Sequence, residues 1–183
     1  MAFFTLPEDA DLKPEARQWL DAFQRLRGTD TVPWSWRAYA DSPRILKASV
    51  TAEENLFNWP PSHSAFSWEA RNVAFMLVAH ARKCEGCFGA SRRSLTALGF
   101  DEPALDGICA NPNALPLLDR ERLFVKYVLQ IAIDPTQLQP PDFREMRAQG
   151  LSREDVHEMI GFAAYAVLNT IFTTTAAAAL RDD

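Results

Sequence analysis

The chain has little glycine and little cysteine, and each shortage excludes a class of protein. Only 7 of the 183 residues are Gly, and the 12 Pro stand singly or in pairs, which excludes a collagen-like or low-complexity chain. Three cysteines are too few, and odd in number, for a secreted disulfide scaffold. The net charge of −5 is small and 48% of the residues are hydrophobic, which excludes intrinsic disorder.

The chain also lacks a basic surplus, and its first residues do not have the pattern of a leader. Its 19 Lys and Arg are outnumbered by 24 Asp and Glu, which argues against a role in binding nucleic acid. Residues 1–6 contain no basic region and no long apolar run, so we expect no signal peptide. Residues 159–180 carry no charge, but they include Asn169 and several threonines and lack an aromatic belt. We therefore expect a buried helix, no membrane association and a cytoplasmic protein.

Apolar residues recur with helical spacing along the chain, and proline, glycine and capping residues separate the segments. The predicted helices cover residues 14–27, 33–39, 43–57, 65–80, 84–98, 101–110, 119–133 and 140–150. A last long helix follows the capping box Ser152-Arg153-Glu154-Asp155. No stretch alternates apolar and polar residues between turn signals, so no strand is predicted. The sequence predicts an all-α fold in one compact domain over residues 1–183.

Cys84 and Cys87 form the one motif with reactive chemistry, a Cys-x-x-Cys at the start of a predicted helix. One helical turn brings both sulfurs within disulfide reach, and the helix N-terminus favours thiolate over thiol. Basic residues outnumber acidic ones around the motif: Arg82, Lys83, Arg92 and Arg93 against Glu85. A thiolate is what nucleophilic attack on a peroxide or a disulfide requires.

Other interpretations of the cysteines compete with this one. A zinc site needs two more soft ligands, but Cys109 is the remaining cysteine, and His63, His80 and His157 are not spaced as a pair. We therefore expect no metal, with His63 and His157 at the surface and Cys109 as a buried thiol. Cys84 and Cys87 could also be two structural residues packed in a core. A thioredoxin fold is excluded because its βαβ setting is absent.

Residues 72–91 resemble the core motif of the AhpD-like alkylhydroperoxidases, within the carboxymuconolactone decarboxylase superfamily. That motif reads Glu, eleven residues, Cys-x-x-Cys, three residues, His. The resemblance extends to residues 30–48, 118–135 and 151–169, which are similar to segments of the peroxidase-related subgroup, including the pattern Ala164-Tyr165…Asn169. It implies an AhpD-like helical bundle that assembles as a homo-oligomer, either a trimer or a hexamer built as a dimer of trimers.

The resemblance also implies roles for individual residues. In the family the second cysteine attacks the peroxide and the first resolves it, which are Cys87 and Cys84 here. Asn72 stands at the position of the relay Glu, and Ser91 stands at the position of the His. Neither replacement can act as a general base near neutral pH. Gly86 stands where the family has a further His between the cysteines.

Two residues are candidates for the missing proton relay. His80 precedes Cys84 by four residues, which places both on one face if the helix is continuous. It is either a replacement proton acceptor, since imidazole titrates near neutral pH, or an ordinary histidine at a helix end. Glu69, one turn before Asn72, is either a replacement acid or a capping or surface residue.

The sequence therefore predicts a thiol-dependent peroxidase that cycles between dithiol and disulfide and uses no cofactor. Its partners would be hydrogen peroxide or an organic hydroperoxide, and an external thiol reductant such as a dihydrolipoyl or thioredoxin-like protein. Two alternatives remain. One is decarboxylation of a γ-lactone, the other activity of the superfamily, which does not use the cysteine pair. The other is a redox sensor or a catalytically decayed protein, which the residues at positions 72 and 91 favour.

Overall fold

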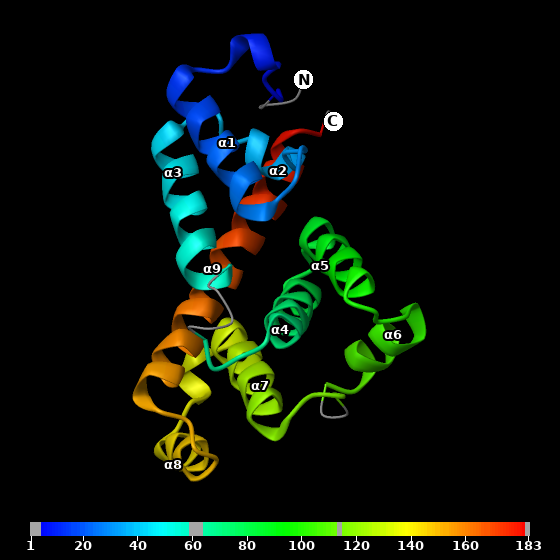
Figure 1. Ribbon diagram of the computed structural model, residues 1–183, viewed down its shortest axis with the longest axis vertical. Coiled ribbons are helices and arrows are strands. Elements are labelled where there is room, and N and C mark those ends of the chain that lie inside the picture. The colour runs from blue at the N-terminus through cyan, green and yellow to red at the C-terminus, as the bar shows by residue number, and fades with distance from the viewer. Residues whose placement is uncertain (1–4, 59–63, 113–114, 182–183) are drawn as a thin grey trace. The chain divides into compact units, whose positions relative to one another are not determined.

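A computed structural model describes residues 5–58, 64–112 and 115–181 of the chain. Over these ranges the chain forms helices joined by turns and contains no strand (Figure 1). The prediction of an all-α fold is confirmed. The described residues group into two compact units, one from residues 5–58 and 171–181 and the other from residues 64–112 and 115–170.

The first unit contains η1 (Asp9–Asp11), α1 (Pro14–Arg27), α2 (Trp34–Arg37), α3 (Pro43–Ala52), η2 (Glu53–Phe57) and the end of α9 (Arg153–Ala179). Helix α1 has the predicted bounds: Pro14 begins it, and Gly28 ends it with a φ of +59°, a backbone conformation that glycine adopts without a Cβ clash. The Phe23 and Trp36 rings pack at a centroid distance of 4.4 Å. The core of this unit comprises Ala16, Leu20, Phe23, Trp36, Ala40, Leu46 and Val50.

The helix predicted for residues 43–57 is not one continuous α-helix. Helix α3 ends at Ala52, and Glu53–Phe57 forms a single π-helical turn. Glu53 is fully buried and forms an ion pair with Arg27, whose guanidinium also lies 4.5 Å from the centroid of the Phe57 ring. A pattern of apolar spacing carries no signal for a buried acid whose partner lies on another helix, so the prediction missed this turn.

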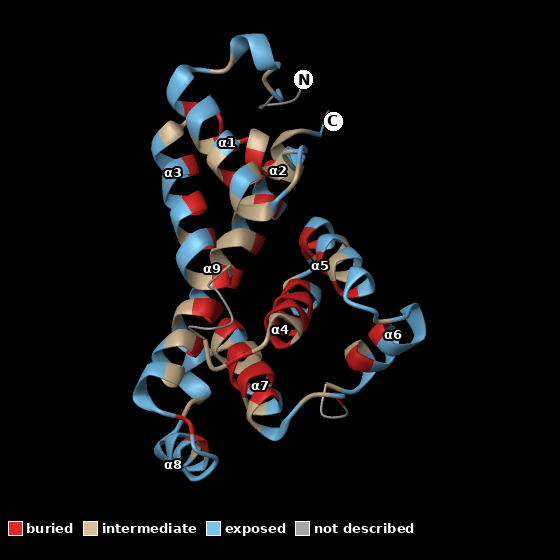
Figure 2. Ribbon diagram, viewed as in Figure 1, coloured by how far each residue is buried: buried red, intermediate tan, exposed pale blue. Residues whose placement is uncertain are grey.

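The second unit contains α4 (Trp68–Ala81), α5 (Glu85–Ala97), α6 (Glu102–Ala110), α7 (Asp119–Ile133), η4 (Pro135–Gln137), α8 (Pro140–Ala148) and the first part of α9. Helix α4 packs against α5 and α7 and is buried without interruption from Ala70 to Ala79 (Figure 2). Apart from Arg71 and Asn72, which donate to the Phe66 and Trp68 carbonyls, this stretch is apolar, as in a helix that is buried on most sides. Helix α4 is therefore the core of this unit.

Helices α4 and α9 each begin where a serine side chain caps the first turn. The helix predicted from residue 65 begins at Trp68, because the Ser67 hydroxyl accepts a hydrogen bond from the Ala70 N–H at 3.1 Å. The capping box before α9 is confirmed. The Asp155 N–H donates to the Ser152 hydroxyl at 3.1 Å, and the Ser152 N–H donates to the Asp155 carboxylate at 2.8 Å.

Helix α9 is 27 residues long, and by length and composition alone it could cross a membrane. A core helix passes the same test, and 44% of its most apolar window is buried. In the second unit Phe162 is buried with its ring 5.2 Å from that of Phe124, which in turn stacks on Phe66 at 4.2 Å. In the first unit the ring of Phe172 lies 4.7 Å from that of Tyr39. These contacts agree with the predicted core helix.

Candidate redox-active site

The cysteine motif lies in the turn that connects α4 to α5. Helix α4 ends at Ala81, and Lys83 adopts a φ of +56°, which interrupts the helical backbone. The Lys83 N–H donates to the His80 carbonyl at 3.0 Å, and the Cys84 N–H donates to the Ala79 carbonyl at 2.9 Å. These two bonds close the turn and make Cys84 the N-cap residue of α5.

Cys84 and Cys87 are joined by a disulfide bond, with 5.4 Å between their Cα atoms. Both residues are buried, with exposed fractions of 2% and 5%. The predicted reach between the two sulfurs is confirmed. Cys109 is free and half-buried on α6, where burial raises the pKa of its thiol.

The last helix supplies a polar neighbour of the Cys87 sulfur. The Cys87 sulfur lies 3.9 Å from the carbonyl oxygen of Asn169 on α9. The side-chain amide of Asn169 donates to the Tyr165 hydroxyl at 2.6 Å, one turn earlier on the same helix. The partial negative charge of a carbonyl oxygen therefore faces one of the two sulfurs.

The residues at the family's relay positions form hydrogen bonds to main-chain carbonyl groups. The Asn72 side-chain amide donates to the Trp68 carbonyl at 2.8 Å, and the Ser91 hydroxyl donates to the Cys87 carbonyl at 3.1 Å. Both side chains are buried. Each hydrogen bond runs within one helix, from residue i to residue i−4.

His80 and Glu69 occupy opposite ends of α4. His80 is exposed, and its ring lies 5.2 Å from the ring of Phe88, the residue after Cys87. Because α4 and α5 are separate helices, the spacing of four residues does not place His80 and Cys84 on one helix face. Glu69 is half-buried in the first turn, about 18 Å along the helix axis from Ala81. That separation argues against proton transfer between Glu69 and the cysteines.

Two of the four basic residues near the motif have partners elsewhere. The Arg82 guanidinium donates to the Thr170 hydroxyl at 2.9 Å and to the Ala132 carbonyl at 3.4 Å, which holds the turn against α9 and α7. Arg92 forms ion pairs with Glu102 and Asp106 of α6. Lys83 and Arg93 are exposed. The positive field at the sulfurs is therefore weaker than the number of basic residues indicates.

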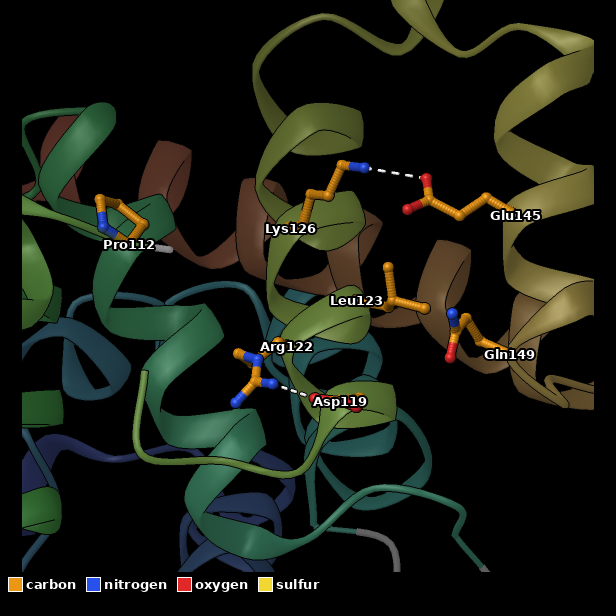
Figure 3. A pocket seen from close by; sticks show the side chains of 7 residues that line it. All are labelled: Pro112, Asp119, Arg122, Leu123, Lys126, Glu145 and Gln149. Atoms are coloured by element: carbon orange, nitrogen blue, oxygen red, sulfur yellow. Dashed lines mark hydrogen bonds and ion pairs between the residues drawn. The ribbon is translucent and has the colours of Figure 1, made fainter. Parts of the chain in front are cut away.

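A pocket between α7 and α8 is not part of this site (Figure 3). Its charged side chains pair with one another, Lys126 with Glu145 at 3.0 Å and Arg122 with Asp119. The pocket is lined by Pro112, Asp119, Arg122, Leu123, Lys126, Glu145 and Gln149, and by no residue of the cysteine motif. Among the described residues, no group of three or more His, Cys, Asp and Glu could hold a metal ion.

Solved structures share the arrangement of these helices. The AhpD core structure of an uncharacterized peroxidase-related protein from Ralstonia eutropha JMP134 matches with a TM-score of 0.79. The chain has the AhpD fold. That match has 19% sequence identity and covers 100% of this chain and 92% of the other. An uncharacterized peroxidase-related protein from Silicibacter sp. TM1040 matches with a TM-score of 0.76 and 20% sequence identity. That match also covers 100% of this chain and 92% of the other. No protein-family model and no curated protein matches the sequence.

In this AhpD-like fold, the cysteines were predictable from the sequence, but the groups around them were not. Asn169 and Thr170 follow Cys87 and Arg82 by more than 80 residues and approach them only because α9 packs beside the turn. One signal for Asn169 was present, since the Tyr165…Asn169 pattern belongs to the family resemblance. His157 is exposed, as expected, and His63 lies outside the described residues.

Proposed function

We propose that this AhpD-like protein is a thiol-dependent hydroperoxidase that cycles between the Cys84/Cys87 dithiol and the disulfide. The observation that carries the proposal is the disulfide within the first turn of α5, in a buried site of this fold. The two structural neighbours bear the description peroxidase-related, which is consistent with peroxide as substrate.

The chemistry needs two thiols and one peroxide. A thiolate sulfur attacks the terminal oxygen of a hydroperoxide, the O–O bond breaks, and the alkoxide leaves and takes up a proton to become an alcohol. The sulfenic acid that forms is then attacked by the second thiol, which releases water and leaves the disulfide. An external dithiol, on a dihydrolipoyl or thioredoxin-like protein, restores the pair by thiol–disulfide exchange. We place the protein in the cytoplasm, where such donors keep thiols reduced.

A redox sensor is the second candidate, and one observation favours it. Asn72 and Ser91 are bonded to main-chain carbonyls and supply no base to the cysteines. General acid–base assistance is worth about 10²- to 10⁴-fold in rate. Without it, the reaction with peroxide would be slower by that factor, which suits a pair that oxidises once as a signal better than one that turns over.

Peroxide consumption separates the two functions. The reduced protein is mixed with one equivalent of hydrogen peroxide or of cumene hydroperoxide, and its free thiols are counted before and after. Excess dihydrolipoamide and peroxide are then added, and the peroxide consumed is measured over time. A peroxidase loses two thiols and then consumes many equivalents, whereas a sensor stops after one. Unchanged thiol counts with both peroxides would refute both functions.

His80 is the proposed proton acceptor for the thiol. It is exposed at the end of α4 and contacts Phe88, next to Cys87. We expect His80→Ala to lower the rate of peroxide reduction by about 10-fold or more, at the low end of general acid–base effects. We also expect the wild-type rate to rise with pH across the range in which histidines lose their proton. His157→Ala, at an exposed position of α9, is the matched control and should leave the rate unchanged. Equal rates for wild type and His80→Ala across that range would disprove the relay.

Self-association is also part of the proposal. On α9, Ile160 and Ile171 remain 42% and 47% exposed, and the uncharged stretch 159–180 gives this helix few polar side chains to cover them. Apolar patches beyond a few hundred Å² are rarely left in water by monomers. We therefore expect self-association, and the family resemblance implies a trimer or a hexamer, which light scattering at micromolar concentration would measure. A monomeric mass at that concentration would contradict this expectation.

A further inference from the structure

Another pocket lies between α8 and the start of α9, in the same unit as the cysteines (Figure 1). Its volume is about 560 Å³, and sites for small molecules typically measure about 300–1,000 Å³. The pocket is lined by Phe143, Arg147, Leu151, Ser152, Arg153, Val156, His157 and Ile160. It is therefore large enough for a small organic ligand.

The lining residues come from one face of each helix. Phe143 and Arg147 are four residues apart on α8. The residues from α9 begin at Arg153 and end at Ile160, with the i, i+3, i+4, i+7 spacing of a single helix face. Leu151, between the two helices, is buried, whereas Phe143 and Ile160 remain 43% and 42% exposed. The pocket therefore offers apolar surface that a ligand would remove from water.

The titratable side chains of the lining are all bases. Arg147, Arg153 and His157 line the pocket, and no Asp or Glu does. Within the described part of the chain, none of the three forms an ion pair. Glu145, an acid of α8, pairs with Lys126 on α7 instead. In a chain with a net charge of −5, this pocket therefore has a local positive charge.

The acids in the first two turns of α9 do not neutralise the pocket. The Asp155 carboxylate accepts a hydrogen bond from the Ser152 N–H at 2.8 Å. Glu158 accepts one from the Ser64 hydroxyl. Glu154 is exposed and does not line the pocket. The two arginines of the lining are therefore available to an anion from solution.

We propose that this pocket binds a small amphiphilic carboxylate, such as the anion of a medium-chain fatty acid. The planar guanidinium groups of Arg147 and Arg153 provide paired N–H donors, which suit the two oxygens of a carboxylate. The apolar tail would cover Phe143 and Ile160, whose burial is favourable. A mostly apolar lining with a few polar groups that orient the ligand is typical of small-molecule sites.

The pocket is separate from the cysteine site. Ile160 and Asn169, whose carbonyl oxygen contacts Cys87, are nine residues apart on α9. That separation is about two and a half helical turns, so the two residues lie on opposite faces of the helix. The proposal therefore does not depend on the peroxidase function, and either one can be wrong without the other.

Titration calorimetry with three probes tests the class of ligand. Octanoate has both a tail and a carboxylate, 1-octanol has the tail without the charge, and acetate has the charge without the tail. We expect octanoate to bind at least about tenfold more tightly than either of the others, because hydrogen bonds to a charged group add about that factor or more. Equal affinities for octanoate and 1-octanol, or no binding of octanoate, would overturn the proposal.

The variant Arg147→Gln/Arg153→Gln tests where the carboxylate binds. We expect it to bind octanoate at least about tenfold more weakly and 1-octanol as the wild type does. Arg144→Gln, at an exposed position of α8 outside the lining, is the matched control and should bind octanoate normally. Circular dichroism checks that both variants fold. Wild-type affinity for octanoate in the double variant would show that the arginines do not hold the carboxylate, contrary to the proposal.

A second copy of the chain is the competing occupant, because Ile160 also belongs to the surface that is expected to self-associate. Light scattering of the wild type and of the double variant decides between the two. If the pocket binds a small carboxylate, both proteins should have the same mass. A lower mass for the double variant, together with no binding of octanoate to the wild type, would assign the pocket to an interface between copies and overturn the proposal.

Discussion

Replacing Cys84 and Cys87 together with serine is expected to reduce peroxide turnover with a dithiol donor to the rate of the buffer alone. A serine hydroxyl does not ionise at neutral pH, is a weak nucleophile without an adjacent base, and cannot form a disulfide. The described surroundings of the pair offer no substitute, since Asn72 and Ser91 are bonded to main-chain carbonyls. The measurement is steady-state peroxide consumption with dihydrolipoamide.

Cys109→Ser is the matched control and should keep the wild-type rate. Cys109 is free and half-buried, and the raised pKa of its thiol makes thiolate scarcer there. Peptide mapping of the oxidised wild type should recover the Cys84–Cys87 link. Residual turnover in the double variant, or a cross-link from Cys109 to either cysteine, would contradict this prediction.

The second large effect is expected from Arg27→Met, which removes the partner of a buried acid. Glu53 has no exposed surface and forms an ion pair with Arg27, whose side chain is 25% exposed. Breaking a buried pair by removing one partner typically costs about 3–5 kcal/mol. We expect the free energy of unfolding at pH 7 to fall by about that amount in urea denaturation followed by circular dichroism.

The loss should depend on pH. Burial raises the pKa of Glu53, and Arg27 partly opposes that rise. A carboxyl whose pKa is raised in the fold stabilises the protein fully below its unfolded pKa and loses that contribution as the pH rises through the folded pKa. Without Arg27 the folded pKa rises further, so the variant should lose less stability at pH 5 than at pH 7.

Arg25→Met, at an exposed position on the same helix, is the control for the loss of a positive charge. It should change the free energy of unfolding by less than about 0.5 kcal/mol. Arg27→Met/Glu53→Gln should recover part of the loss, because the uncompensated charge is gone. A loss in Arg27→Met that is equal at pH 5 and pH 7 would mean that lost packing, and not the charge of Glu53, is the cause.

The sequence by itself determined the helices whose signals are local. Helix α1 begins at Pro14 and ends before Gly28, and α7 covers Asp119–Ile133, as their periodicity and end signals predict. The box at Ser152 and Asp155 forms the two hydrogen bonds that its spacing predicts. The short distance between Cys84 and Cys87 is also a local feature, because a separation of three residues is about one helical turn.

Tertiary structure alone decided what surrounds those elements. Lys83, in the left-handed backbone conformation, separates α4 from α5, so His80 and Cys84 do not share the face that one continuous helix would give them. The ion pair of Arg27 and Glu53 and the contact of Cys87 with Asn169 join residues that are far apart in the sequence. The spacing of residues determines which side chains share a face of one helix. Which face meets another helix depends on how the whole core packs, and that packing brings the Asn169 carbonyl oxygen to Cys87.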